Sequence, residues 1–205
     1  MIRSGALLAV LALAACTGDD ITPAGVTGPD AGGETQVTGT IDGVAFDAKD
    51  AISRSTIADG FEFQDESTVV LVTDFTSACA NQASDHGVAN GQLLAVVMAT
   101  VDANGSSHPL TAPGTFGVTD AAPAASSSAA QIYYEKDGAN CFKTNFYMAT
   151  SGTVVVTAVD GAGTVSGTFS ATFPASSGNQ QISGGFIAPQ CAALDPNRTP
   201  LATCQ

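Results

Sequence analysis

The sequence predicts an all-β domain built as an antiparallel β-sandwich, with a partly closed β-barrel as the alternative. Three observations predict it. Apolar and polar residues alternate strictly from Thr164 onward, Asp-Gly turn signals separate the apolar runs, and no segment of ten or more residues has the helical period of 3.6. The runs indicate about nine or ten strands and little helix, and no single feature demands closure into a barrel.

The first predicted strands flank a two-residue turn. Residues 37–41 alternate in hydropathy, Asp42-Gly43 follows as a strong hairpin signal, and residues 44–48 alternate again. A second pair of strands is expected around Phe61–Gln64 and Thr68–Phe75, where β-branched and aromatic residues gather.

The next strand is expected to be covered on both faces. Residues 93–101 are apolar at nearly every position, and Gly91 and Asn104-Gly105 bracket them too tightly for the alternative of a buried helix. The stretch SACANQASD at 77–85 predicts one short helical turn. The stretch AAPAASSSAA at 121–130 predicts an exposed loop, because it combines Pro123 with a run of serines.

The clearest strand lies near the C-terminal end. Asp160-Gly161 joins it to a preceding strand at Thr153–Val159, and a turn at 176–179 leads into a following strand at Ile182–Ile187, which makes a three-stranded meander. Thr and Ser form its outer face, as expected for a half-buried antiparallel strand. The residues expected on its buried face are Val165, Gly167, Phe169, Ala171 and Phe173.

This C-terminal region resembles domains of exported lipoproteins of Gram-negative bacteria that have no assigned activity. Those domains carry a GTV strand, a V-x-G-x-F-x-A-x-F strand and a closing G-x-F-x-A-P-x-C. Here the three are Gly152–Val154, Val165–Phe173 and Gly185–Cys191, with Ile187 between Phe186 and Ala188. The resemblance covers forty residues and implies a β-fold and a lipid anchor, but no activity.

The chain opens on a segment typical of export. Arg3 is the only charge before Gly5–Ala15, a run of eleven apolar and small residues that is too short to span a bilayer. The following Leu13-Ala14-Ala15-Cys16 resembles the bacterial lipobox. The resemblance implies that the chain is cut before Cys16 and that its thiol carries lipid. An ordinary signal peptide cut after Ala15 is the alternative.

The expected organisation is a signal peptide at 1–15, a lipidated Cys16 with a flexible tether at 16–33, and one β-domain at 34–205. Thr17 stands where an Asp would favour retention in the inner membrane. We therefore expect an exported protein, anchored by its lipid to the outer membrane of a Gram-negative bacterium.

The formal net charge of −13 restricts which classes of partner are expected. Such a surface repels nucleic-acid phosphates and anionic lipid head groups, so nucleic acid is not expected as a partner, and attachment to the membrane is expected through the lipid. An envelope protein or a glycan is the expected class of partner, and no cofactor is expected.

The remaining cysteines are Cys79, Cys141, Cys191 and Cys204, an even number that predicts two disulfides in an exported protein. Three connectivities are possible. We favour Cys79–Cys141 with Cys191–Cys204, because the second pair closes a short loop near the end of the chain. Zinc is the alternative, but the spacings contain no C-x-x-C.

Motifs of catalysis or metal binding are weak. His86 and His108 both fall in polar, turn-like stretches, and there is no G-x-S-x-G motif. The stretch DANG from Asp102 matches the start of an EF-hand loop, but its twelfth position is Pro113, where a Glu is needed. No metal site is therefore assigned. A calcium site remains open among the carboxylates Asp59, Glu62, Asp65 and Glu66.

Tyr133 and Tyr134 are the candidates for an exposed ligand platform, because neighbouring residues of a strand face opposite ways. Packing at the sheet margin is the alternative. The leading hypothesis is a membrane-anchored, non-enzymatic interaction or structural module. The alternatives are a module that binds a glycan, a lipid or Ca²⁺, and a hydrolase built on one of the histidines.

Overall fold

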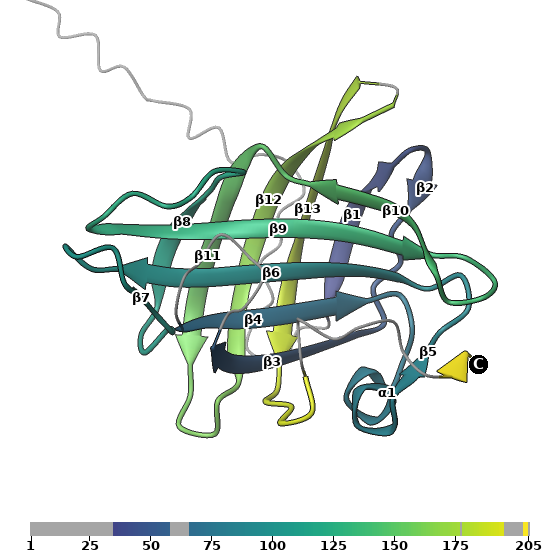
Figure 1. Ribbon diagram of the computed structural model, residues 1–205, viewed down its shortest axis with the longest axis horizontal. Coiled ribbons are helices and arrows are strands. Elements are labelled where there is room, and N and C mark those ends of the chain that lie inside the picture. Colours follow the sequence, from purple (N-terminus) through teal and green to yellow (C-terminus); the bar gives the residue numbers. More distant parts are fainter. Residues whose placement is uncertain (1–34, 58–65, 177, 195–202, 205) are drawn as a thin grey trace, which may run out of the picture.

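The computed structural model describes residues 35–57, 66–176, 178–194 and 203–204, and these form an all-β fold with one short helix (Figure 1). Ten strands are longer than two residues, as the sequence predicts. The longer strands are β1 (Gln36–Ile41), β3 (Asp50–Ile57), β4 (Glu66–Thr73), β6 (Gln92–Val101), β8 (Gly114–Val118), β9 (Ser127–Asp137), β10 (Lys143–Met148), β11 (Ser151–Val159), β12 (Val165–Ala175) and β13 (Gly178–Ala188). The short ones are β2 (Val44–Ala45), β5 (His86–Gly87), β7 (Ser107–His108) and β14 (Thr203–Cys204), and the helix is α1 (Ala78–Ser84).

The long strands form a single open sheet that curls into a half-barrel. Its order is β2-β1-β13-β12-β11-β8-β9-β6-β4-β3, with β10 beside β9 and β7 beside β6. All pairs in it are antiparallel except β8 with β9, which pair in parallel over two residues only. The sheet is therefore mixed, and it corresponds more closely to the partly closed barrel than to two separate sheets of a sandwich.

Figure 1 shows how the sheet folds over itself. Strands β8, β11, β12, β13 and β1 form one layer, and β9, β6, β4 and β3 run across it as a second layer. Crossing layers of this kind enclose a core between their inner faces. That core includes Leu94, Val96 and Met98 of β6, which pack with Phe169 and Phe173 of β12.

The predicted alternation in β12 is confirmed. Its burial alternates along the strand, and the side chains of Phe169 and Phe173 are 3% and 0% exposed. Burying an aromatic side chain of this size stabilises the fold by about 1.5–3 kcal/mol. The meander is also confirmed, since β12 pairs with β11 on one side and with β13 on the other.

The prediction that residues 93–101 form a strand covered on both faces is confirmed as well. Val96 faces the main core, whereas Val97 belongs to a second apolar cluster, and both are fully buried. The second cluster also holds Leu71 of β4, Tyr133 of β9 and Cys191 beyond β13. Both faces of the β4-β6-β9 layer are thus used for packing.

Local turn chemistry fixes the hairpins. Asp42 and Gly43 have φ values of 51° and 75°, which a type I′ turn requires, and they join β1 to β2 as predicted. The carboxylate of Asp160 accepts hydrogen bonds from the N–H groups of Ala162 and Thr164 at 2.9 and 2.8 Å, which closes the β11–β12 turn. These contacts lower the pKa of Asp160, with the Thr164 amide as the main cause.

Two further sequence predictions have mixed outcomes. The short helical turn at 77–85 is confirmed as α1. The loop at 121–130 is only partly confirmed, because β9 already begins at Ser127 and buries Ala129 and Ala130. The predicted strand at Phe61–Gln64 lies outside the described residues.

The predicted disulfide pairing is wrong. The bonds are Cys79–Cys191 and Cys141–Cys204, with Cα atoms 5.7 and 5.5 Å apart. The fold places α1 beside the segment that follows β13, and β14 beside β5 near the β9–β10 turn. Closeness in sequence, on which the prediction relied, has no bearing on either contact.

Candidate functional site

A cleft lies beside β1, between this strand and the start of β3. Its volume is about 650 Å³, within the range of small-molecule and peptide sites. In Figure 1, β1 lies at one end of its layer and β3 at the margin of the other, so the cleft lies where the half-barrel stays open. Its lining residues are Thr35, Gln36, Val37, Thr38, Asp47, Ala48, Lys49, Asp50, Ala51, Ile187 and Pro189.

One wall of the cleft is the edge of β1. Residues 36–39 pair with β13 on one side, while β2 pairs only with Thr40 and Ile41 on the other. A Cβ added to Gly184 of β13 would lie 2.3 Å from the carbonyl oxygen of Gln36, so that carbonyl points toward β13. Backbone groups of successive residues in a strand point to opposite sides. The N–H and C=O of Val37 therefore point away from β13, toward the cleft.

The opposite wall carries charges. Nζ of Lys49 lies 2.6 Å from Oδ2 of Asp47, and the side chains are 46% and 79% exposed. Asp50 is held more firmly, because its Oδ1 accepts from the Ala51 amide at 2.9 Å and its Oδ2 from the Ala78 amide at 2.8 Å. Two carboxylates against one ammonium give this wall a negative charge.

The cleft ends where β3 becomes covered. The Ser53 amide donates to the carbonyl of Pro189 at 2.8 Å, and the Cys191 amide donates to the carbonyl of Ser53 at 2.7 Å. The disulfide from Cys191 to Cys79 fixes this segment against α1. At Ser53 the outer edge of β3 is therefore occupied by the chain itself, whereas the edge of β1 beside Val37 has no paired strand among the described residues.

A buried polar network lies at one end of the main core. The hydroxyl of Tyr134 donates to Oε1 of Gln92 at 2.8 Å, and Nε2 of Gln92 donates to Oδ2 of Asp74 at 3.0 Å and to the Ala45 carbonyl at 3.2 Å. Burial raises the pKa of Tyr134 to about 12. The ring stacks on that of Tyr147, with centroids 6.3 Å apart. These groups satisfy one another, which indicates a structural role.

Tyr147 in turn binds the hairpin turn of β1 and β2. Its hydroxyl donates to Oδ2 of Asp42, and the hydroxyl of Ser176 donates to Oδ1 at 2.7 Å. These bonds lower the pKa of Asp42, and the bond from Tyr147 is the main cause. The turn is thereby tied to the start of β13, which keeps β1 in place beside the cleft.

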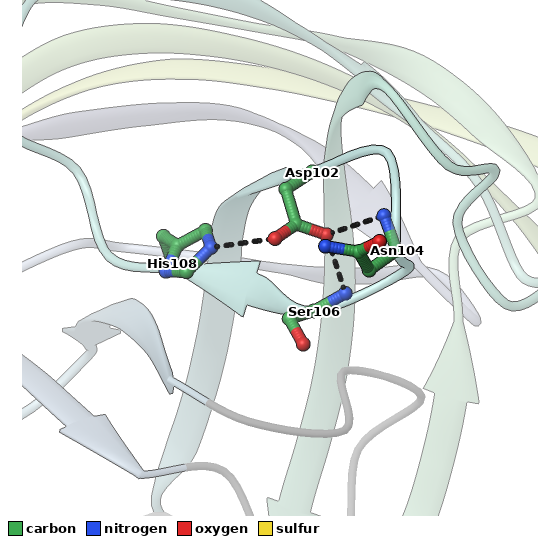
Figure 2. Close-up of polar contacts among 4 residues, drawn as sticks. All are labelled: Asp102, Asn104, Ser106 and His108. Atoms are coloured by element: carbon green, nitrogen blue, oxygen red, sulfur yellow. Dashed lines mark hydrogen bonds and ion pairs between the residues drawn. The ribbon is translucent and has the colours of Figure 1, made fainter.

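The structure places Asp102 and His108 in a surface turn (Figure 2). Oδ1 of Asp102 accepts from the amides of Asn104 and Ser106 at 2.8 and 3.0 Å, and Oδ2 lies 3.4 Å from Nε2 of His108. The amide of Asn104 is the main cause that lowers the pKa of Asp102. Figure 2 shows the Ser106 hydroxyl directed away from His108, so these two residues do not form a nucleophile–base pair.

The other candidate residues are not brought together. His86 lies in β5 and His108 in β7, at opposite ends of the molecule in Figure 1. Of the four calcium candidates, Glu66 begins β4 and is exposed, whereas Asp59, Glu62 and Asp65 lie outside the described residues. Within the described ranges, no three His, Cys, Asp or Glu side chains are grouped to hold a metal ion.

The prediction of an exposed tyrosine platform is wrong. Tyr133 and Tyr134 are 6% and 2% exposed, because both faces of β9 are packed. Among the described residues, the large aromatic side chains that are exposed are Phe142 and Phe146, at 59% and 49%. Phe146 stacks on Tyr133 with centroids 5.7 Å apart, and Nζ of Lys143 lies 4.7 Å from its ring centre. Phe146 thus has two partners within the chain, although about half of it stays exposed.

Sequence reasoning missed the cleft beside β1. The available signal was the polar stretch Asp47-Ala48-Lys49-Asp50 between two strands, but nothing in it showed that β1 would be left with a free edge. Among the described residues, no helix is both long and apolar enough to cross a membrane. Comparison with protein-family models, with curated proteins and with solved structures finds no match to this chain.

Proposed function

We propose that the chain is an exported protein, held on the outer membrane of a Gram-negative bacterium by lipid on Cys16, whose β-domain binds another envelope component rather than catalysing a reaction. The observation that carries the proposal is the pair of disulfides. Cys79–Cys191 and Cys141–Cys204 use four of the five cysteines of the chain and leave only Cys16.

Disulfides persist in oxidising compartments such as the periplasm and the cell surface, and they are rare in the cytosol. The remaining Cys16 stands at the end of the lipobox-like stretch Leu13–Cys16, outside the described residues. Two acyl chains are enough for stable anchoring, since each buried CH₂ contributes about 0.8 kcal/mol. The lipobox-like stretch with Cys16 and the two disulfides of the domain thus both favour an exported, membrane-anchored protein.

A binding role is favoured over a hydrolase by the arrangement of the polar groups. His86 and His108 lie apart, and the carboxylate of Asp102 is engaged by backbone amides. The cleft beside β1 offers exposed backbone and a net negative charge, which serve recognition.

The anchor is tested by expressing the full chain with Cys16→Ser in a Gram-negative host, with Thr17→Ser as the matched control. We expect wild type and the control to fractionate with membranes and to incorporate labelled palmitate, and the Cys16→Ser chain to lose the label and leave the membrane fraction. If Cys16→Ser stays fully membrane-bound and still takes up label, the proposal is overturned.

A further inference from the structure

We propose that the cleft beside β1 binds an extended, cationic peptide segment, which pairs with the free edge of β1 as an added strand. The inference deepens the proposed function and rests on it in one respect, namely that the partner segment belongs to an envelope protein. The chemistry of recognition comes from the cleft itself, through its backbone, a few apolar side chains in a mostly polar lining, and its charge.

The backbone of β1 supplies the first argument. The N–H and C=O of Val37 point away from β13, and no described strand pairs with them. An unpaired edge of this kind is a template for another strand, and natural proteins usually cover or blunt it. Within the described residues, Pro189–Cys191 covers the outer edge of β3 at Ser53, whereas no strand covers the edge of β1 beside Val37. Addition of a strand is a recurring mode of peptide recognition.

The lining of the cleft supplies the second argument. Apolar side chains contribute to it from both layers, namely Val37, Ala48, Ala51, Ile187 and Pro189. Alternate side chains of an added strand would face this lining, while the others would face solvent and the charged wall. Residues 36–39 extend over roughly 14 Å at the usual rise of a strand, so the cleft suits a short segment that alternates apolar and polar residues.

Charge supplies the third argument and decides the class of occupant. Asp47 is 79% exposed, Asp50 also lines the cleft, and Lys49 offsets only one of the two carboxylates. The whole chain carries a net charge of −13, which attracts cationic segments and repels acidic ones. A second copy of this chain would bring the same acidic wall to the same edge, so a cationic peptide is favoured over self-association.

The binding experiment uses the detergent-solubilised full chain and three fluorescent peptides. The probe KVKVTVK alternates valine with lysine, EVEVTVE has the same pattern with opposite charge, and KVKPTVK keeps the charge but carries a central proline that interrupts strand pairing. We expect saturable binding of KVKVTVK by fluorescence anisotropy, with both other peptides at least about tenfold weaker. Amide exchange should slow in residues 35–39.

A charge reversal at the wall tests the site with a matched control. Asp47→Lys and Asp120→Lys change the net charge equally, and both side chains are exposed, but Asp120 lies in the loop after β8, away from the cleft lining. We expect Asp47→Lys to weaken KVKVTVK binding by about tenfold and to improve binding of EVEVTVE, whereas Asp120→Lys has little effect. Equal weakening by both variants would show that binding depends only on net charge, and it would overturn the proposal.

A backbone variant tests the edge itself. In Val37→Pro the backbone loses only the N–H that points toward the cleft, so the N–H groups that pair with β13 are kept. The substitution also exchanges a partly buried side chain that packs against the main core. Peptide binding should fall at least tenfold. If this variant does not fold, Asp47→Lys carries the test. Absence of saturable binding up to millimolar peptide, or equal binding of KVKPTVK, would overturn the proposal. So would a dimer that Val37→Pro abolishes, because the edge would then belong to a second copy.

The two proposals can fail separately. Membrane release of Cys16→Ser tests the anchor, whereas peptide binding to solubilised wild-type chain tests the cleft. A chain that binds KVKVTVK but keeps its membrane attachment without Cys16 would refute the location and leave the cleft standing.

Discussion

The buried network around Tyr134 makes a sharp prediction about stability. Its hydroxyl is the donor to Oε1 of Gln92 at 2.8 Å, and the two side chains are 2% and 7% exposed. In Tyr134→Phe the ring and its packing remain, but Oε1 of Gln92 loses its donor in a place that water barely reaches. An unsatisfied buried acceptor costs about 1–3 kcal/mol, which for a domain of this size lowers Tm by roughly 3–10 °C.

Tyr147→Phe is the matched control. It removes a hydroxyl from the same stacked pair, but its partner Asp42 keeps the amide and hydroxyl of Ser176 as donors and lies near solvent. We expect a smaller drop in Tm for this variant in thermal unfolding followed by circular dichroism. If both variants lower Tm equally, or if Tyr134→Phe has no effect, the network does not stabilise the core as argued.

The same residue predicts a pH dependence. Burial raises the pKa of Tyr134 to about 12, whereas an unfolded chain ionises its tyrosines near 10. The folded state therefore holds its proton more tightly, and this contribution to stability is fully present below pH 10 and is lost as the pH rises through 12. Urea unfolding between pH 9 and 12 should show a steeper loss for wild type than for Tyr134→Phe. Parallel curves would contradict the assignment.

Three further predictions concern other parts of the fold. Burial raises the pKa of Asp137 from 3.8 to about 6, so the stability that this residue contributes is lost as the pH rises between these values. In urea unfolding, Asp137→Asn should stabilise the protein at pH 7 by about 1 kcal/mol, after allowance for partial exposure, and should have no effect near pH 3. Gly152 has φ +146°, and a Cβ there would lie 2.0 Å from a carbonyl oxygen of β12. Gly152→Ala should therefore lower the free energy of unfolding by about 2–3 kcal/mol, whereas Gly161→Ala, with open space around it, should be near neutral in the same assay. The disulfide Cys141–Cys204 includes the exposed Cys204. Limiting reductant, followed by alkylation and mass spectrometry, should therefore label this pair before the more buried disulfide. The reverse order would show that accessibility does not govern reduction.

Elements whose burial shows in the local order of apolar and polar residues could be predicted from the sequence. Strand β12 alternates because one face meets the core and the other meets solvent, and each residue from Val165 to Phe173 reports its own environment. Asp42-Gly43 predicts its hairpin for a similar reason, since both residues need positive φ and few other pairs tolerate it. The unbroken apolar run of β6 likewise reports two packed faces.

Features that depend on distant neighbours could not be predicted. The half-barrel depends on the parallel contact of Gly117 and Val118 with β9. These two residue pairs produce no recognisable pattern in the sequence of either strand. The disulfide Cys79–Cys191 joins residues 112 positions apart, which meet only because α1 packs against the segment after β13. The cleft is a still harder case, because Val37 has the same alternating pattern whether or not a strand lies on its other side.

The two proposals together restrict which partners can reach the cleft. Thr35 lines it, and eighteen residues separate Thr35 from the proposed anchor at Cys16. With the flexible tether that the sequence predicts for these residues, the edge of β1 would lie at a root-mean-square distance of roughly 20–25 Å from the lipid. Basic segments next to a membrane are drawn toward anionic head groups and lie in the same layer. Under the two proposals, an acidic cleft at this height would meet the membrane-proximal basic segments of other envelope proteins more readily than soluble ligands that diffuse farther from the surface.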